Sequence, residues 1–117
     1  MVARKSYVPE RGHIVWLDFN PQTGHEQAGH RPALVISPKI YNEKSGLLLA
    51  CPLTSKVKGY PFAVELPAKD GGGCVLTDQI KSLDWRVRKA KFKSKIPSRA
   101  LKEVLGKLEV LIFAKEN

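Results

Sequence analysis

Short apolar runs, each ended by turn-forming residues, restrict the fold of this chain more than any other feature of its sequence. Runs of β-branched, aromatic and leucine residues occupy positions 14–19, 33–37 and 47–51, a composition typical of buried strands. A proline or an Asn-Pro pair follows each run, and proline lacks the N–H that a central strand needs. The pattern therefore predicts a series of short strands, with one helical turn over residues 40–45 between the second and the third.

The second half of the chain adds further strands and then one helix. Residues 62–66 alternate apolar and polar side chains, residues 74–77 follow a Gly-Gly-Gly turn, and the lysine-rich residues 91–96 are typical of an edge strand. Beyond Pro97, with Ser98 as a candidate N-cap, apolar residues recur at helical spacings of three and four. They are Leu101, Val104, Leu105, Leu108, Leu111 and Ile112. The 117 residues therefore predict one domain over 1–117, mainly β with α (α+β), in which the helix packs across a small curled sheet or barrel.

The charge of the chain points to an anionic partner. The formal net charge is +9 at pH 7, and a strong excess of one sign attracts polyanions over long distances. Solubility alone can also explain such an excess, so the distribution of the charge matters more than its size. Between positions 81 and 95 the only acidic residue is Asp84, and the basic residues there are Lys81, Arg86, Arg88, Lys89, Lys91, Lys93 and Lys95. This stretch predicts an electrostatic track for phosphates, the alternative being a solvated basic face.

Other sequence features indicate the compartment. No apolar run approaches the roughly 20 residues that span a bilayer, and the first residues lack the apolar core of a signal peptide. We therefore expect a cytoplasmic protein without a membrane partner. Cys51 and Cys74 stand in apolar stretches outside any metal-ligand pattern, which predicts two buried free thiols.

The polar loop at 20–31 concentrates the residues with chemical potential. It holds His25, Glu26, Gln27, His30 and Arg31, between two predicted strands where functional loops are often found. The histidines are five apart, whereas the zinc-binding helix motif needs them four apart, so no metal is expected. The glycines lack the Lys-Ser/Thr ending of a phosphate-cradling loop, so no nucleotide cofactor is expected either. Chemistry alone leaves two interpretations open: an active site, or a solvated loop with a surface ion pair.

Seven sequence blocks form a pattern that extends beyond the loop. The longest is Gly-His-Glu-Gln-Ala-Gly-His-Arg-Pro-Ala at 24–33, followed by an apolar run and Ser-Pro. The others lie at residues 7–12, 18–21, 52–54, 58–62, 78–83 and 85–88. The blocks span nearly the whole chain, and in their order and spacing they resemble the MazF/PemK family of toxin endoribonucleases. The resemblance favours the active-site interpretation of the loop.

The resemblance implies a fold, an activity and partners. The fold would be an SH3-like five-stranded barrel of the CcdB/MazF type, with short helices and a C-terminal amphipathic helix. The activity would be sequence-specific, ribosome-independent cleavage of single-stranded RNA without a metal or other cofactor. The partners would be a second copy in a homodimer and a cognate antitoxin whose acidic C-terminal segment complements the positive charge.

The resemblance also implies roles for three residues. Attack of a ribose 2′-hydroxyl on the adjacent phosphate needs a proton acceptor and stabilisation of the phosphate charge. We assign Glu26 as the base, Arg31 as the stabiliser and Thr54 as a phosphate-contacting hydroxyl, with a 2′,3′-cyclic phosphate and a 5′-hydroxyl as products. An alternative division lets the arginine take part in proton transfer and gives the glutamate a positioning task. His25 can titrate near neutrality and is a further candidate acid, against the alternative of a surface histidine.

A second group of residues is predicted to bind RNA. Lysines can meet phosphates, Tyr60 can stack on a base, and the amide of Gln79 can read a base edge. A solvated loop, a core tyrosine and a strand-end hydrogen bond are the respective structural alternatives. The full predicted set is Gln27, His30, Lys56, Lys58, Tyr60, Gln79, Lys81, Arg86 and Arg88.

Two other functions compete with RNA cleavage. Toxins of the same fold that poison DNA gyrase resemble one another in a Trp-Gly-Ile tail, whereas this chain ends Phe-Ala-Lys-Glu-Asn. The second rival is an SH3-like module that binds RNA without cutting it. The stretches Gln-Ala-Gly-His-Arg-Pro and Lys-Gly-Tyr-Pro-Phe look most similar to members that cut at ACA, which is therefore the expected cleavage sequence.

Overall fold

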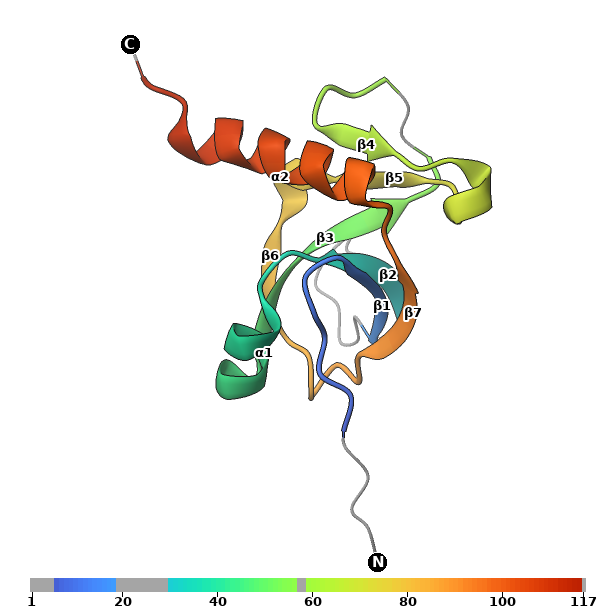
Figure 1. The fold of residues 1–117 in the computed structure, drawn as a ribbon, viewed down its shortest axis with the longest axis vertical. Helices are drawn as coiled ribbons and strands as arrows, with labels where there is room; N and C mark the ends of the chain where they lie inside the picture. Colours follow the sequence, from blue (N-terminus) through green and yellow to red (C-terminus); the bar gives the residue numbers. More distant parts are fainter. Residues whose placement is uncertain (1–5, 19–29, 57–58, 117) are drawn as a thin grey trace, which may run out of the picture.

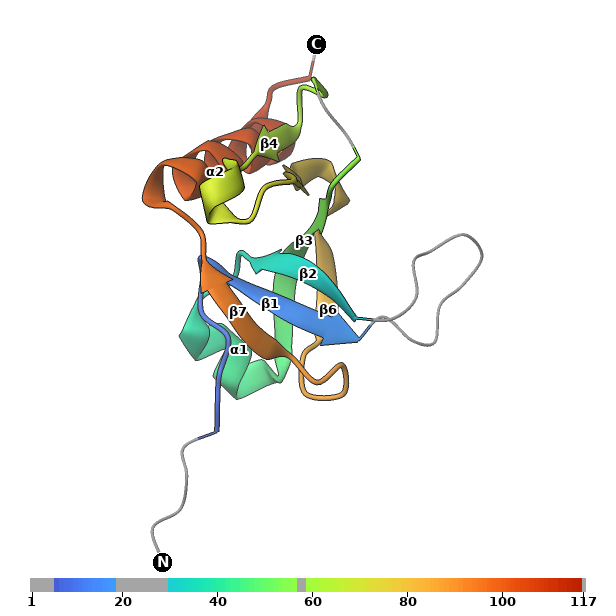
Figure 2. The ribbon, with the colours of Figure 1, turned by 90° about the vertical axis from the view of Figure 1, so that its right-hand side faces the viewer.

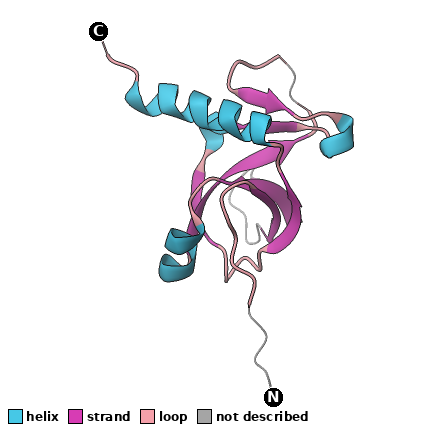
Figure 3. Cartoon of the chain, in the orientation of Figure 1, coloured by secondary structure: helices cyan, strands magenta, loops and turns pink. Residues whose placement is uncertain are grey.

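The computed structural model describes residues 6–18, 30–56 and 59–116. Within these ranges the chain forms seven strands, two α-helices and two short 3-10 helices (Figures 1 and 3). In chain order they are β1 (His13–Asp18), β2 (His30–Val35), α1 (Lys39–Ser45), β3 (Leu47–Thr54), β4 (Ala63–Glu65), η1 (Ala68–Asp70), β5 (Cys74–Leu76), η2 (Thr77–Gln79), β6 (Lys81–Asp84), β7 (Lys91–Lys95) and α2 (Ser98–Phe113). The α+β class predicted from the sequence is confirmed.

All strand pairs are antiparallel, and β3 organises the sheet. The strand order is β4-β5-β3-β2-β1-β7, and β6 also pairs with β3. The first half of β3 pairs with β6 and its last two residues pair with β5. The resemblance implied five strands in a barrel; the described residues form seven, and among them β4, β6 and β7 each pair with only one neighbour. β6 was not predicted, because two of its four residues are exposed and polar and no apolar run marks it.

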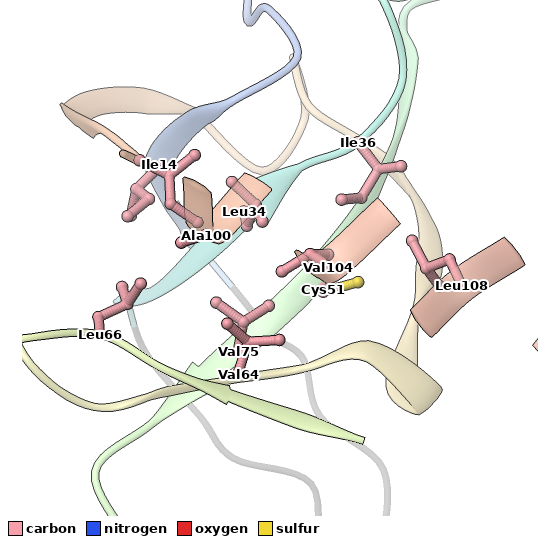
Figure 4. Close-up of a cluster of buried hydrophobic side chains, with 11 residues drawn as sticks. Ile14, Leu34, Ile36, Cys51, Val64, Leu66, Val75, Ala100, Val104 and Leu108 are labelled. Carbon is pink, nitrogen blue, oxygen red and sulfur yellow. The ribbon is translucent and has the colours of Figure 1, made fainter. Parts of the chain in front are cut away.

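The strands bury both of their faces, which explains their continuous apolar runs. Side chains alternate across a strand, so neighbouring residues of β1 and β2 enter different cores. Ile14 and Leu34 belong to one cluster, which α2, β4 and β5 cover (Figure 4). Val15 and Ala33 belong to a second cluster on the opposite face, which Trp85 helps to close. The sheet therefore carries two packed layers, and the free thiols predicted at Cys51 and Cys74 are both buried.

The helix α2 packs on the first cluster through only part of its apolar stripe. Ala100, Val104 and Leu108 are buried, whereas Leu111 and Ile112 are 43% and 66% exposed. The predicted stripe was therefore too long, because the last turn of the helix extends beyond the sheet (Figure 1). The N-cap prediction was also wrong: Pro97 occupies the N-cap position and Ser98 is the first helical residue. No helix among the described residues combines the length and the apolar character needed to cross a membrane.

The strand β3 runs past the proline that was predicted to end it. Pro52 pairs with Ala33 of β2, and the strand continues to Thr54. On its other side, Pro52 lies between the residues that pair with β6 and those that pair with β5. The missing N–H therefore falls at a change of partner, where the ladder loses little. This continuation matters for function because it extends the strand to Thr54.

A buried polar side chain, Asn42 of α1, fixes the short helix to the rest of the fold. Its Nδ2 donates to the backbone oxygen of Pro9 at 2.8 Å and to that of Ser37 at 3.1 Å, while its Oδ1 accepts from Ser37 Oγ at 2.5 Å. The backbone oxygen of Asn42 also accepts from Trp85 Nε1 at 2.8 Å. The side chain of Asn42 is fully buried.

Replacing Asn42 with alanine is expected to lower the free energy of unfolding by about 1–3 kcal/mol, because it leaves the partners of the amide buried and unpaired. Urea denaturation followed by circular dichroism measures the change. Ser45→Ala is the control. The hydroxyl of Ser45 donates a hydrogen bond to the backbone oxygen of Tyr41 at an exposed position, so its removal should lower the free energy of unfolding by less than about 0.5 kcal/mol. Equal effects of the two substitutions would contradict a special role for the buried amide.

Candidate functional site

A groove of about 340 Å³ lies between the sheet and the turn that connects β4 to β5. Figure 2 shows β1, β2 and β7 side by side, below α2 and β4. The residues that line the groove come from β1, β2, β3, the turn after η1, and β7; they are Ile14, Trp16, Arg31, Pro32, Leu53, Thr54, Ser55, Lys56, Asp70, Gly71, Gly72, Gly73 and Lys93. Two of the three predicted catalytic residues, Arg31 and Thr54, are among them.

The antiparallel register of β2 and β3 explains why Arg31 and Thr54 share one groove. Ala33 pairs with Pro52 in this ladder. Arg31 and Thr54 lie two residues beyond this pair, at the same end of β2 and β3, and both line the groove there. Arg31 is exposed and Thr54 is partly buried, so a guanidinium and a hydroxyl from distant parts of the sequence are available to one ligand.

The glycine turn at 71–73 forms the wall of the groove beside Thr54. Gly73 has φ of +78°, and a Cβ built on it would lie 2.9 Å from the backbone oxygen of Thr54. Only glycine accepts both this conformation and this approach without strain. The hydroxyl Oγ1 of Thr54 accepts a hydrogen bond from the backbone N–H of Lys56 at 3.3 Å. The turn and this bond together position Thr54 at the end of β3.

The groove has a positive electrostatic character. Three of its lining residues, Arg31, Lys56 and Lys93, carry positive charge, whereas Asp70 is the only acidic one among the lining residues described. All three cationic side chains are exposed. An exposed cluster of this kind attracts a phosphodiester through charge and hydrogen bonds. The groove is therefore suited to hold a phosphate near the Thr54 hydroxyl.

Two groove residues had no predicted role in the site. Trp16 lies in the run at 14–19 that predicted a buried strand, but it is only partly buried and lines the groove. The ammonium Nζ of Lys93 lies 5.6 Å from the centre of the Trp16 ring, within the range of a cation–π interaction. The sequence carries no signal for Trp16, because its strand alternation places it on the same face as the buried Ile14. Lys93 belongs to the predicted basic stretch but was not distinguished from its neighbours there.

Several predicted site residues lie outside the described ranges. These are Glu26, Gln27, Lys58 and the candidate acid His25. His30 is the first residue of β2, pairs with Asp18 at the end of β1, and is exposed. It precedes Arg31 directly but is not among the groove-lining residues. The roles assigned to these residues remain predictions.

Tyr60 and Gln79 lie near η2 rather than in the lining of the groove. The hydroxyl of Tyr60 donates a hydrogen bond to Asp78 Oδ2. This bond, the largest cause, together with burial and the negative charge of Asp78, raises the pKa of Tyr60 above its ordinary value. Gln79 is exposed at the end of η2. Both side chains remain accessible to a long ligand that extends beyond the groove.

The predicted basic stretch is divided between different tasks. Arg86 Nη2 donates to the backbone oxygen of Glu43 at 2.9 Å, and its guanidinium lies 4.9 Å from the centre of the Trp85 ring. Arg88 Nη1 donates to the backbone oxygen of Asp18 at 3.1 Å. Lys81 is exposed at the start of β6. Of this stretch only Lys93 lines the groove. RNA binding by Lys81, Arg86 and Arg88 stays a prediction.

Comparison with known proteins identifies the family. A family model described as the PemK-like, MazF-like toxin of type II toxin–antitoxin systems matches residues 10–112. The Endoribonuclease toxin MazF of Escherichia coli (strain K12) is 47% identical over 112 residues, covering 96% of this chain and 99% of that protein. The Endoribonuclease PemK of Escherichia coli is 32% identical, covering 96% of this chain and 87% of that protein.

Solved structures agree with the sequence comparison. The crystal structure of MazE-MazF (Form-II) from Deinococcus radiodurans has a TM-score of 0.85 and 55% sequence identity, covering 94% of this chain and all of that one (100%). The crystal structure of MazF (Form-I) from the same organism has a TM-score of 0.83 and 56% identity, covering 92% of this chain and 98% of that one. Fold, sequence and family model lead to one conclusion: the chain belongs to the PemK/MazF family of toxins of type II toxin–antitoxin systems.

Proposed function

We propose that this protein is an endoribonuclease toxin that cleaves single-stranded RNA in the groove between β1, β2 and the glycine turn. The observation that carries the proposal is the meeting of Arg31 and Thr54 in one cationic groove. The membership in a toxin family, and the names of relatives such as the Escherichia coli endoribonuclease toxin MazF, support the same activity.

The proposed reaction needs no group beyond those of the chain and the RNA. A 2′-hydroxyl loses its proton to Glu26 and attacks the adjacent phosphorus. The bond to the 5′-oxygen of the next nucleotide breaks as that oxygen takes up a proton, for which His25 is the candidate donor. The products are a 2′,3′-cyclic phosphate and a 5′-hydroxyl. Arg31 stabilises the dianionic phosphorane, because its planar fork matches two phosphate oxygens and stays charged. Thr54 donates its hydroxyl hydrogen to a further phosphate oxygen.

The activity is tested on a long mixed-sequence RNA in EDTA. Sequencing the 5′-hydroxyl ends is expected to find discrete new ends at one short sequence, with ACA as the proposed motif. The same experiment tests metal independence, because EDTA removes divalent metals, and specificity, because the new ends identify the cleaved sequence. Binding of the RNA without new ends would contradict the proposed endoribonuclease activity and favour the rival, an RNA-binding module. Absence of both binding and new ends, with inhibition of DNA gyrase, would favour the gyrase-poisoning rival.

The proposed partners are a second copy of the chain and an antitoxin with an acidic segment. The support is the net charge of +9 and the similarity to a chain in a structure titled MazE-MazF. A peptide rich in aspartate and glutamate is expected to inhibit cleavage in competition with RNA, since both are anionic. Sedimentation of the protein alone tests the dimer.

The salt dependence of RNA binding shows whether a groove lysine, here Lys56, neutralises a phosphate. For single-stranded RNA, each neutralised phosphate contributes roughly 0.7 to the slope of log affinity against log salt. Lys56→Met is therefore expected to weaken binding at low salt and reduce the slope by about 0.7. The measurement uses fluorescence anisotropy of a 2′-O-methyl strand, which binds but cannot be cut by 2′-hydroxyl attack.

The control for this measurement removes the same charge elsewhere. Lys115, near the exposed C-terminus, is replaced by methionine and should leave the slope nearly unchanged. If the two substitutions change the slope equally, the binding is governed by net charge and not by the groove.

A further inference from the structure

We propose that Trp16 and Lys93 form a stacking subsite for one nucleobase, next to the phosphate held by Arg31 and Thr54. The inference rests on the proposed function, because it concerns the same groove. It assigns a nucleobase as the ligand of Trp16, which lies in a run that predicted only a buried strand. Three features of the groove support it: the exposure of the indole, the placement of Lys93, and the absence of side chains on the facing turn.

The position of Trp16 on β1 explains why its indole is available. Trp16 lies two residues beyond Ile14, so both side chains leave the strand on the same face. Ile14 is only 2% exposed, within the cluster that α2, β4 and β5 cover. Trp16 is paired with Pro32 and is only partly buried. The covering layer therefore ends between the two residues and leaves the indole facing the groove.

An irregularity in the β1–β7 ladder places Lys93 over the indole. Ile14 pairs with Ser94, whereas the next residue, Val15, pairs with Phe92, so the register of these two strands leaves Lys93 as the extra residue of β7. An extra residue of this kind bends a strand and redirects a side chain, and such bulges are frequent beside active sites. Here the redirected ammonium lies 5.6 Å from the centre of the Trp16 ring.

The glycine turn leaves room opposite this pair. A Cβ built on Gly71 would lie 3.6 Å from Lys93 Nζ, so a larger side chain there would fill the space around the ammonium. The three consecutive glycines, all with positive φ, form a wall made of backbone alone. The turn has no side chain that holds the ammonium in place, so Lys93 can swing away from the ring and a flat ligand can take its place on the indole.

The chemistry of the pair favours a nucleobase over an acidic peptide. Every base presents a π-face, and stacking on an exposed aromatic ring is a general way in which proteins hold single-stranded nucleic acid. Lys93 can then turn from the ring to the phosphate that accompanies the base. A carboxylate could form an ion pair with Lys93, but it does not stack on the face of an indole. The two ligands therefore differ in whether they depend on the ring of Trp16.

The test is a double-mutant cycle between Trp16 and single positions of a 2′-O-methyl strand. Binding is measured for the wild type, Trp16→Leu and Trp16→Tyr, with an abasic residue moved along the strand. Trp16→Leu is expected to weaken binding about tenfold or more, and Trp16→Tyr by less than about threefold, because tyrosine keeps a stacking face. At one strand position, abasic substitution should weaken the wild type but not Trp16→Leu.

The matched control substitutions lie on β7, the β-strand that carries Lys93. Phe92, 47% exposed and paired with Val15, lies on the opposite face of β7, so Phe92→Leu removes an exposed aromatic ring away from the groove. Lys95, paired with His13, lies outside the groove lining, so Lys95→Met is compared with Lys93→Met. Neither control is expected to couple to the abasic position.

The outcomes separate this inference from the proposed function. If the wild type cleaves RNA but no strand position couples to Trp16, the subsite is overturned and the cleavage stands. If a strand position couples to Trp16 but the wild type does not cleave RNA, the subsite is supported and the proposed endoribonuclease activity is wrong. If an acidic peptide loses affinity with Trp16→Leu while RNA does not, the groove is a peptide site and the inference is wrong.

Discussion

Replacing Arg31 with lysine is expected to lower kcat/KM for RNA cleavage by about 100-fold to 1,000-fold, the usual effect of removing a donor aimed at transition-state charge. Lysine keeps the positive charge but presents a single ammonium in place of a planar fork, so it cannot span two phosphate oxygens. Binding of the uncut 2′-O-methyl strand should fall much less than the cleavage rate, because the charge remains. Single-turnover cleavage of a fluorescent RNA, in EDTA, measures the effect.

The exposure of Arg31 makes this prediction specific to catalysis. An exposed side chain at the start of β2 should contribute little to stability, so the melting temperature is expected to stay within a few degrees of the wild type. Arg99→Lys, on the exposed face of α2, is the matched control and should cleave normally. If Arg31→Lys retained more than half of the wild-type rate, the bidentate role of Arg31 would be wrong.

Replacing Gly73 with alanine is expected to produce the largest loss of stability among single methyl additions to the groove. The backbone of Gly73 has φ of +78°, and the new Cβ would lie 2.9 Å from the backbone oxygen of Thr54. The left-handed conformation alone costs a non-glycine residue about 1–2 kcal/mol, and the displaced oxygen belongs to β3, which pairs there with β5. We expect a total loss of about 3 kcal/mol or more, together with reduced cleavage because Thr54 moves.

The neighbouring glycine supplies the control. Gly72 also has positive φ, of +67°, but a Cβ there meets only the Cα of Ala68, at 4.0 Å. Gly72→Ala should therefore cost about 1–2 kcal/mol, the left-handed penalty alone, and leave cleavage nearly normal. Guanidinium unfolding and the cleavage assay are applied to both proteins. Equal losses in the two would show that contact with Thr54 contributes nothing.

The sequence was sufficient for the elements whose pattern is local. The apolar runs on both sides of Ile14 and Leu34 marked β1 and β2, because a strand buried on both faces is continuously apolar. Leucine and valine spacing marked α2, which runs to Phe113 and includes Leu111. The same reasoning failed at Pro52 and did not show that Leu111 lies beyond the sheet, since neither proline chemistry nor helical spacing reports where a neighbouring strand or sheet ends.

The candidate site shows the same division. The resemblance to a family singled out Arg31 and Thr54, and both line the groove. The predicted basic stretch, in contrast, is spread over several elements: Arg86 and Arg88 bond to backbone oxygens, and Lys93 lines the groove. RNA binding by the rest of the stretch stays a prediction. Charge along a sequence says nothing about which strand face or turn each residue occupies.

By itself, the sequence determined the short strands, the terminal helix, the positive charge and, through its resemblance to known toxins, the residues proposed for catalysis. Tertiary structure alone decided that Arg31 meets Thr54, that Trp16 faces a groove instead of a core, and that Gly73 presses against β3. The reason is physical: periodicity and turn chemistry act over a few residues, whereas exposure depends on what packs across a face. Ile14 and Trp16 share one face of β1, and only the extent of the layer above them makes one a core residue and the other part of the groove.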